Sequence, residues 1–236
     1  MSTVPLLTWL LPAEVARSER FGEAAEPAGL PAERAAIAHA VASRRRDYLG
    51  VRDCAREAFG ALGAPPAPIG TGPRREPLWP SGLVGSLTHC SGYRAAAVAH
   101  AGRVRSVGID AEPHEPLPPG VLDLVALDEE RASLGVVGAE VGVPVHADRV
   151  LFCAKEAVYK AWYPLTGEWL GFEEARVRIE VTALDPVRGR FGARLLRSAT
   201  ALDGTPLSGF DGRWVAAGGF AAAAVVVPAG PAPGGF

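Results

Sequence analysis

The sequence predicts an α+β fold, in which strands and long helices are mixed along one chain. Two stretches with apolar residues at helical spacing, residues 31–62 and 149–162, predict long helices. Several Val-rich or alternating stretches, separated by turns such as Asp-Gly, predict strands. Of the 236 residues, 48% are hydrophobic and 21% charged, so the chain can fill a core and is not disordered as a whole.

The N-terminal part is expected to hold a strand, one or two helices and a loop. Residues 4–11 form an apolar run broken by Pro5, which predicts a first strand and is too short for a signal peptide or membrane anchor. Residues 31–62 predict one or two helices with a break near Gly50. Residues 63–80 are dense in Pro and Gly, and long irregular connections are more often functional than idle.

Beyond this loop, strands alternate with one clear helix. Residues 83–89 and 104–110 predict strands, whereas residues 91–99 between them fit either a short helix or a strand. The helix of residues 149–162 follows. The remaining expected elements are strands at 172–181, 190–196 and 213–227 and a flexible Pro/Gly-rich tail at 228–236.

Charge and cysteine content exclude several classes of protein. The formal net charge is −2, so no global positive field attracts nucleic acid or an anionic membrane, and we expect neither as a partner. The three cysteines, Cys54, Cys90 and Cys153, form no Cys-x-x-Cys pair. We therefore expect neither a disulfide framework nor a structural zinc site. We expect the protein to be located in the cytoplasm.

Two carboxylates close the predicted strand 104–110. Asp110 and Glu112 are two residues apart and project to the same face of a strand. Unpaired charge at the end of an apolar strand is costly unless a cation is present. Oxygen ligands without His or Cys favour Mg²⁺ or a similar ion such as Mn²⁺. The alternative is a strand end that merely reaches solvent, and an isolated Asp-x-Glu does not decide between the two.

The predicted helix 149–162 carries a second group of charges. Glu156 and Lys160 are four residues apart and share a face, and Lys155 lies about 100° round from Glu156. The pair is either an ordinary surface ion pair or a site in which Glu156 is a metal ligand or base and both lysines meet phosphate oxygens. The stripe expected to be buried is Leu151, Ala154, Val158 and Ala161.

Two upstream segments offer groups that bind anions. His89 ends a predicted strand and precedes Ser-Gly, which suits a phosphate contact through the side chain and backbone N–H groups. A Cys90 nucleophile with His89 as its base fails, because neighbouring strand residues point to opposite faces. The basic run that contains Arg44 continues to Arg52, and arginine suits bidentate phosphate binding, although a charge run is usually a solvated face.

Two of these segments, Val107–Glu112 and Phe152–Lys160, resemble in order and spacing the paired signature of the surfactin-type phosphopantetheinyl transferases. Residues 51–56, Trp79-Pro80 and 85–90 resemble the subgroup that includes the enterobactin-synthase transferase and its actinobacterial relatives. The resemblance implies two similar α/β halves, related by a pseudo-twofold axis, with coenzyme A in the cleft between them. The implied parts are an N-terminal half at 1–106 and a C-terminal half with the metal site at 107–227.

The resemblance also implies roles for individual residues. Asp110, Glu112 and Glu156 would hold Mg²⁺ against the pyrophosphate of coenzyme A, and Lys155 would assist them in catalysis. Thr71 stands where close relatives carry a lysine that contacts an anion. Arg74 or Arg75 can make this contact in its place. The residues implied to contact coenzyme A are Arg44, Arg52, Arg74, Thr88, His89, Lys155 and Lys160.

The implied activity is transfer of 4'-phosphopantetheine from coenzyme A to a serine of an apo acyl or peptidyl carrier protein, with release of 3',5'-ADP. The enzyme is expected to be a monomer, with Glu156 as the base and Glu112 as the alternative. One competing interpretation is another magnesium phosphotransferase, which the lack of a Gly-x-x-x-x-Gly-Lys-[Ser/Thr] loop disfavours. The other is a non-catalytic module that binds carrier proteins and coenzyme A. Residues 113–125 are the suspected carrier-binding stretch.

Overall fold

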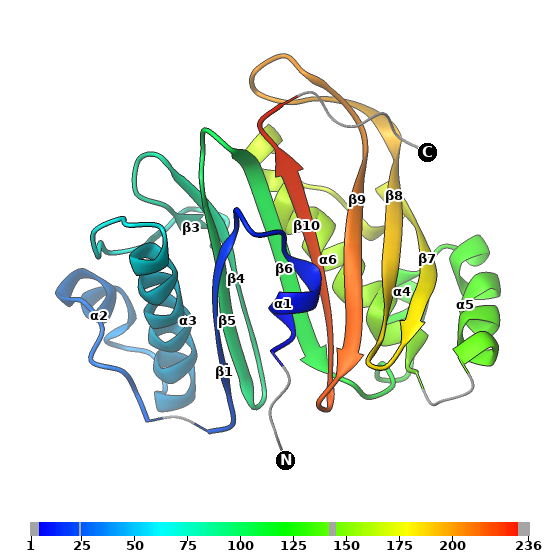
Figure 1. Ribbon diagram of the computed structural model, residues 1–236, viewed down its shortest axis with the longest axis horizontal. Coiled ribbons are helices and arrows are strands. Elements are labelled where there is room, and N and C mark those ends of the chain that lie inside the picture. The colour runs from blue at the N-terminus through cyan, green and yellow to red at the C-terminus, as the bar shows by residue number, and fades with distance from the viewer. Residues whose placement is uncertain (1–4, 24, 142–144, 231–236) are drawn as a thin grey trace.

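The computed structural model describes residues 5–23, 25–141 and 145–230, and it mixes strands with long helices as expected (Figure 1). One antiparallel sheet has the order β1-β5-β4 and a second has the order β6-β10-β9-β8-β7, with a small β2-β3 hairpin beside them. The elements are α1 (Leu7–Leu10), β1 (Ala16–Phe21), α2 (Pro31–Ile37), α3 (Ala42–Ala61), β2 (Gly70–Thr71), β3 (Pro77–Leu78), β4 (Leu83–Cys90), β5 (Tyr93–His100), β6 (Val104–Pro113), α4 (Val121–Val125), α5 (Asp128–Val141), α6 (Ala147–Thr166), β7 (Ala175–Leu184), β8 (Val187–Thr200), β9 (Pro206–Ala217) and β10 (Phe220–Pro228).

The expected strand at residues 4–11 is wrong, because the described part of this run contains the short helix α1. Leu6, Leu7, Leu10 and Leu11 are buried against β9 and β10, and this spacing is helical. The carboxylate of Glu19 accepts hydrogen bonds from the backbone N–H groups of Leu6 and Leu7 and so fixes the start of the helix. Residues 1–4 lie outside the described residues.

The helix break expected near Gly50 is also wrong, because α3 runs through this position and the break lies between α2 and α3. A Cβ atom at Gly50 would lie 2.7 Å from the Cδ atom of Arg94, so the glycine makes room for an arginine from β5. On its buried face, α3 packs Cys54, Ala58 and Phe59 against the N-terminal sheet. The segment 91–99, which fitted either type of element, forms strand β5.

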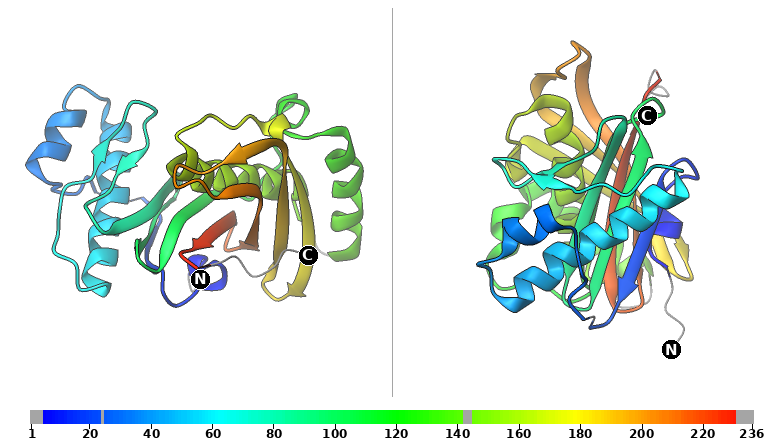
Figure 2. Two further views of the ribbon diagram at one scale, coloured as in Figure 1. Left: turned by 90° about the horizontal axis from the view of Figure 1, so that it is seen from above. Right: turned by 90° about the vertical axis from the view of Figure 1, so that its left-hand side faces the viewer.

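The two sheets meet where β4 lies beside β6. The backbone N–H of Ile109 donates to Ser86 Oγ at 3.0 Å, and that of Ala111 donates to Thr88 Oγ1 at 3.1 Å. Hydroxyl groups therefore take the place of carbonyl acceptors along this seam. Seen from above, α3 and α6 lie against different sheets on the two sides of it (Figure 2).

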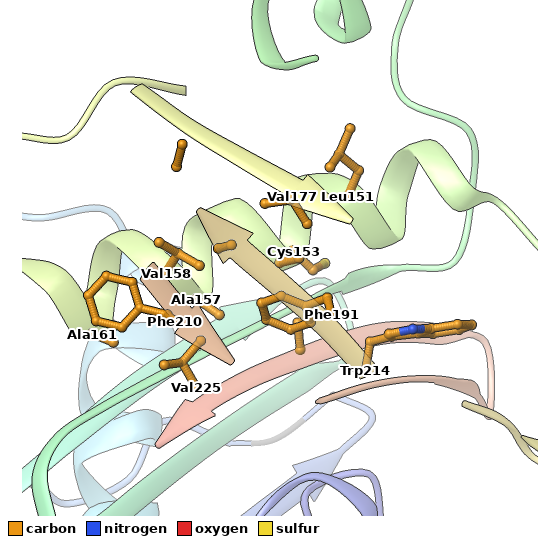
Figure 3. Close-up of a cluster of buried hydrophobic side chains, with 14 of the residues drawn as sticks. Leu151, Cys153, Ala157, Val158, Ala161, Val177, Phe191, Phe210, Trp214 and Val225 are labelled. Atoms are coloured by element: carbon orange, nitrogen blue, oxygen red, sulfur yellow. The ribbon is translucent and has the colours of Figure 1, made fainter. Parts of the chain in front are cut away.

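Helix α6 is fixed closely on the C-terminal sheet (Figure 3). The predicted stripe of Leu151, Ala154, Val158 and Ala161 is fully buried. A Cβ atom at Gly108 would overlap the carbonyl oxygen of Ala157, so this glycine lets α6 approach β6. The position of α6 relative to the end of β6 follows from this contact. In the described residues, no helix is both long enough and apolar enough to cross a membrane. Of the expected tail, residues 231–236 lie outside the described residues.

Candidate active site

A cavity of about 590 Å³ lies along the seam and is lined by elements from both sides of it. Its walls come from α3, the β2-β3 hairpin, β4, β6 and α6. Its volume is in the range of cofactor sites. Most of the residues that the sequence singles out meet here, whereas Glu112 and Lys155 do not line it. Those that do are Arg44, Arg52, Arg74, Thr88, His89, Asp110, Glu156 and Lys160.

Asp110 is the most constrained acidic residue of the cavity. Its Oδ1 atom accepts hydrogen bonds from Lys160 Nζ at 2.8 Å and from the hydroxyl of Thr88 at 3.3 Å. Its Oδ2 atom is buried and has no hydrogen-bond partner. Burial favours the neutral amine of Lys160, but the nearby Asp110 carboxylate raises its pKa above the ordinary value. Lys160 is therefore a fixed cation beside Asp110, and one oxygen of the carboxylate remains for a ligand.

Two further carboxyl groups lie in the field of Asp110. Burial and the Asp110 charge raise the pKa of Glu112 to about 7 and raise the pKa of Glu156 above its ordinary value. Arg149 Nη1 lies 3.9 Å from Glu112 Oε2. Raised pKa values at neighbouring carboxyl groups indicate uncompensated negative charge, which a cation would remove.

The three carboxyl groups of the site are of a type that binds a hard cation, but they do not surround a common point. The unpartnered oxygen of Asp110 and the carboxyl groups of Glu112 and Glu156 are the oxygen ligands that Mg²⁺ prefers. Within the described residues, no group of three Asp, Glu, His or Cys side chains is arranged so that it could hold a metal ion. Asp110 and Glu156 line the cavity and Glu112 lies beside it.

Arg52 lines the cavity, but protein groups also hold it. It is 4% exposed and donates to the carbonyl oxygens of Tyr48, Ile69 and Gly70 and to the hydroxyl of Thr71. Its guanidinium lies 3.3 Å from the centre of the Tyr48 ring. Arg52 therefore ties strand β2 to α3 and shapes the cavity wall, and most of its N–H donors are already used. Thr71 is held in the same network.

Lys155 does not reach the cavity. It is 3% exposed, and its Nζ lies 2.7 Å from Glu130 Oε2 and donates to the carbonyl oxygens of Val125 and Phe172, both at 2.8 Å. Burial lowers the pKa of Lys155. The rotation of about 100° between consecutive helix residues turns Lys155 away from the main cavity, and it borders a smaller cavity together with Glu156. This placement does not support a phosphate contact by Lys155.

A smaller cavity of about 130 Å³ adjoins the first. Trp169, Leu170 and Phe172 form its apolar walls, and Glu156 and Tyr159 border both cavities. The Tyr159 and Trp169 rings are 4.9 Å apart between their centres. Glu156 and Tyr159 therefore lie between the two cavities, and Lys155 also borders the smaller one.

The sequence analysis missed Glu130 and Asp47, two acidic residues that hold site residues. Glu130 looks like part of an exposed acidic run, Asp128-Glu129-Glu130, and only its buried contacts distinguish it. Asp47 follows the basic run Arg44–Arg46. An acidic residue directly after three arginines could have indicated an ion pair. The segment was interpreted only as a basic run, so Asp47 was not considered.

Comparisons with known proteins show the family of this chain. Residues 32–99 match the 4'-phosphopantetheinyl transferase N-terminal domain, and residues 106–203 match the 4'-phosphopantetheinyl transferase superfamily. The chain is 51% identical to 4'-phosphopantetheinyl transferase Npt of Nocardia iowensis, over 93% of this chain and 99% of the relative. It is 47% identical to 4'-phosphopantetheinyl transferase PptT of Mycobacterium tuberculosis, over 96% and 100%. Enterobactin synthase component D of Salmonella typhi is more distant, at 33% over 50% and 48%. The chain therefore belongs to the 4'-phosphopantetheinyl transferase superfamily.

Proposed function

We propose that this protein transfers the 4'-phosphopantetheine arm of coenzyme A to a serine hydroxyl of apo acyl or peptidyl carrier proteins and releases 3',5'-ADP. Similarity to named transferases over nearly the whole chain supports the reaction. The observation that carries the site is Asp110, which binds Lys160 through one oxygen and keeps the other buried without a partner in a cavity lined by elements from both sides of the seam.

Asp110, Glu156 and Glu112 would hold Mg²⁺, or Mn²⁺ in its place, and the bound ion supplies Lewis-acid chemistry to a pyrophosphate. Lys160 adds a fixed positive charge beside Asp110, where negative charge would develop on the leaving 3',5'-ADP as the phosphoanhydride bond of the pyrophosphate breaks. Glu156 is the proposed base for the serine proton, because its carboxyl group lines the cavity near Asp110. Glu112 is the alternative base.

The side of the cavity formed by α3 and the β2-β3 hairpin suits the nucleotide phosphates. Arg44 and His89 lie together on that side, and the β2-β3 hairpin adds Arg74 and Arg75. Arginine and histidine donors of this kind bind phosphate oxygens. The smaller apolar cavity beyond Glu156 suits the pantetheine arm. A molecule of coenzyme A would thus extend from α3 to α6, with its pyrophosphate near Asp110.

We also propose the finer assignments that the resemblance implies. The protein is placed in the surfactin-type group, within the enterobactin-synthase-like actinobacterial subgroup. Its two halves, 1–106 and 107–227, are proposed to be related by a pseudo-twofold axis. An antiparallel sheet covered by a 20-residue helix, α3 or α6, in each half supports this symmetry. A monomer in the cytoplasm is proposed, and the three free cysteines fit a reducing compartment.

The test is intact-mass analysis of apo carrier proteins incubated with this protein, coenzyme A and Mg²⁺, with EDTA as the control. A gain of one phosphopantetheine that disappears with EDTA would support the reaction and its metal dependence. Fatty-acid, polyketide and nonribosomal-peptide carriers are all needed. No gain on any of them, with coenzyme A still bound, would favour the non-catalytic module. No binding of coenzyme A would overturn the proposal.

A further inference from the structure

We infer that Asp47 on α3 is a positioning residue that orients His89 and lets it carry a proton when a phosphate group occupies the cavity. This inference rests on the proposed function, because the phosphate is one of those of coenzyme A. It is carried by the contacts on the two nitrogen atoms of the His89 ring.

The first contact fixes which nitrogen of His89 accepts. Arg44 Nη1 lies 3.3 Å from His89 Nε2. A guanidinium has only donors, so Nε2 must provide its lone pair. A neutral ring with a free Nε2 carries its proton on Nδ1. The Arg44 contact therefore predicts the Nδ1–H form of His89.

The second contact places Asp47 beside that proton. Asp47 Oδ2 lies 3.9 Å from His89 Nδ1, within ion-pair range and longer than a hydrogen bond. Contacts of this kind commonly shorten when a substrate binds. The other oxygen, Oδ1, accepts from Arg94 Nη2 at 2.8 Å and from Arg94 Nε at 3.1 Å. Arg94 is 5% exposed and fits beneath α3 at Gly50, so Asp47 is held from behind.

Asp47 is the acid that favours a proton on His89. Burial lowers the pKa of His89, and Arg44 on α3, Lys160 on α6 and Arg94 on β5 act in the same direction. Asp47 opposes all four effects. An arriving phosphate adds negative charge beside Nε2, and the ring can then take a second proton there and donate to the phosphate. A carboxylate beside the other nitrogen stabilises that charged ring.

The experiment measures binding of 3',5'-ADP by calorimetry to the full-length wild type and to Asp47→Asn, His89→Gln and the double variant. Near pH 6.5, we expect Asp47→Asn to weaken binding about tenfold, the equivalent of about one pKa unit at His89. In the His89→Gln background the same change should cost less than about twofold, because Asp47 then has no ring to act on. Asp53→Asn is the matched control, since Asp53 lies on the same helix, pairs with Arg20 and Arg56 and does not line the cavity.

Two further readouts separate this role from a merely structural one. Wild-type affinity should fall as the pH rises through the pKa of His89 in the complex, and Asp47→Asn should move this fall to lower pH. Asp47→Glu, which keeps the carboxylate, should restore part of the affinity. Without any variant, the ¹⁵N signals of His89 in the wild type should show a neutral ring protonated at Nδ1.

An equal loss in both backgrounds would overturn the inference, as would an unchanged pH profile or a free ring protonated at Nε2. Failure of the wild type to bind either 3',5'-ADP or coenzyme A would overturn the proposed function, and the inference with it. Normal wild-type binding together with no effect of Asp47→Asn would overturn the inference alone.

Discussion

Lys160 Nζ donates to Asp110 Oδ1 at 2.8 Å, while the second oxygen of the same carboxylate is buried without a partner. The two oxygens thus differ in their contacts. One is held by an ammonium group of α6, and the other is the oxygen that we propose binds a cation at the end of β6. This division leads to the first prediction.

Asp110→Asn should abolish transfer while the fold is kept. The amide oxygen can still accept from Lys160, but the amide nitrogen cannot ligate a cation in place of Oδ2. We expect a loss of about 100-fold or more in kcat/KM and a Tm within a few degrees of the wild type. Carrier-protein mass analysis with a Mg²⁺ titration measures the first, and Asp203→Asn, an exposed site paired with Arg105, is the control. Turnover near the wild-type rate would remove Asp110 from the site.

Glu112→Gln should stabilise the metal-free protein at high pH. In the folded chain the pKa of Glu112 is raised from 4.5 to about 7, so its ionisation opposes folding as the pH rises through this window. Near pH 8 with EDTA, the variant should be more stable by about 1–3 kcal/mol, and near pH 4 the two proteins should match. Urea unfolding at both pH values measures this difference. A less stable variant at pH 8 would show that the Glu112 charge is already compensated.

Lys155→Met should reduce stability rather than affinity for coenzyme A. It leaves the carboxylate of Glu130, which is 2% exposed, without its cation. Breaking a buried pair from one side costs about 3–5 kcal/mol. Adding Glu130→Gln should recover part of this loss, because it removes the buried charge and its amide oxygen can still accept from one of the two N–H groups that Glu130 binds, those of Leu127 and Val177. Urea unfolding and coenzyme A calorimetry at low temperature separate the two effects. A stable variant that no longer binds coenzyme A would restore the phosphate-contact interpretation.

Gly108→Ala should displace α6 from β6. The new Cβ atom meets the carbonyl oxygen of Ala157, a backbone atom that cannot rotate away. We expect a loss of about 3 kcal/mol or more, and activity should fall because Glu156 and Lys160 move relative to Asp110. Gly60→Ala is the matched control, since it lies in α3 with no atom within 4 Å and should be neutral or stabilising by about 0.5–1 kcal/mol. Equal unfolding curves for the two variants would contradict the close approach.

One-sided burial makes an element easy to predict from the sequence. Helix α6 has a single apolar stripe, and its existence and position follow from that stripe. Strand β5 is different, because Tyr93, Ala95 and Ala97 pack on one face while Ala96 and Val98 pack on the other. A strand buried on both faces shows no alternation, so helix and strand fit it equally.

The site residues divide in a similar way. Asp110, Glu156 and Lys160 meet as the resemblance implies, because β6 and α6 set their directions. Arg52 lines the cavity with most of its donors bound to protein acceptors, and Lys155 lies outside it, because each satisfies partners that are distant in sequence. For Arg52 these are the carbonyl groups of the β2 segment, and for Lys155 they are Glu130 and Phe172. Such partners depend on tertiary packing, which no local pattern encodes.

The hydroxyl-to-backbone bonds between β4 and β6 limit which substitutions the protein can accept during evolution. Valine has nearly the shape of threonine and favours strands, so replacing Thr88 by valine would satisfy both volume and strand propensity. It would nevertheless leave the N–H of Ala111 without an acceptor and release one contact of Asp110. Positions 86 and 88 are therefore expected to drift only between serine and threonine. These hydroxyl groups are needed for the hydrogen bonds between β4 and β6 as much as for the contact with Asp110.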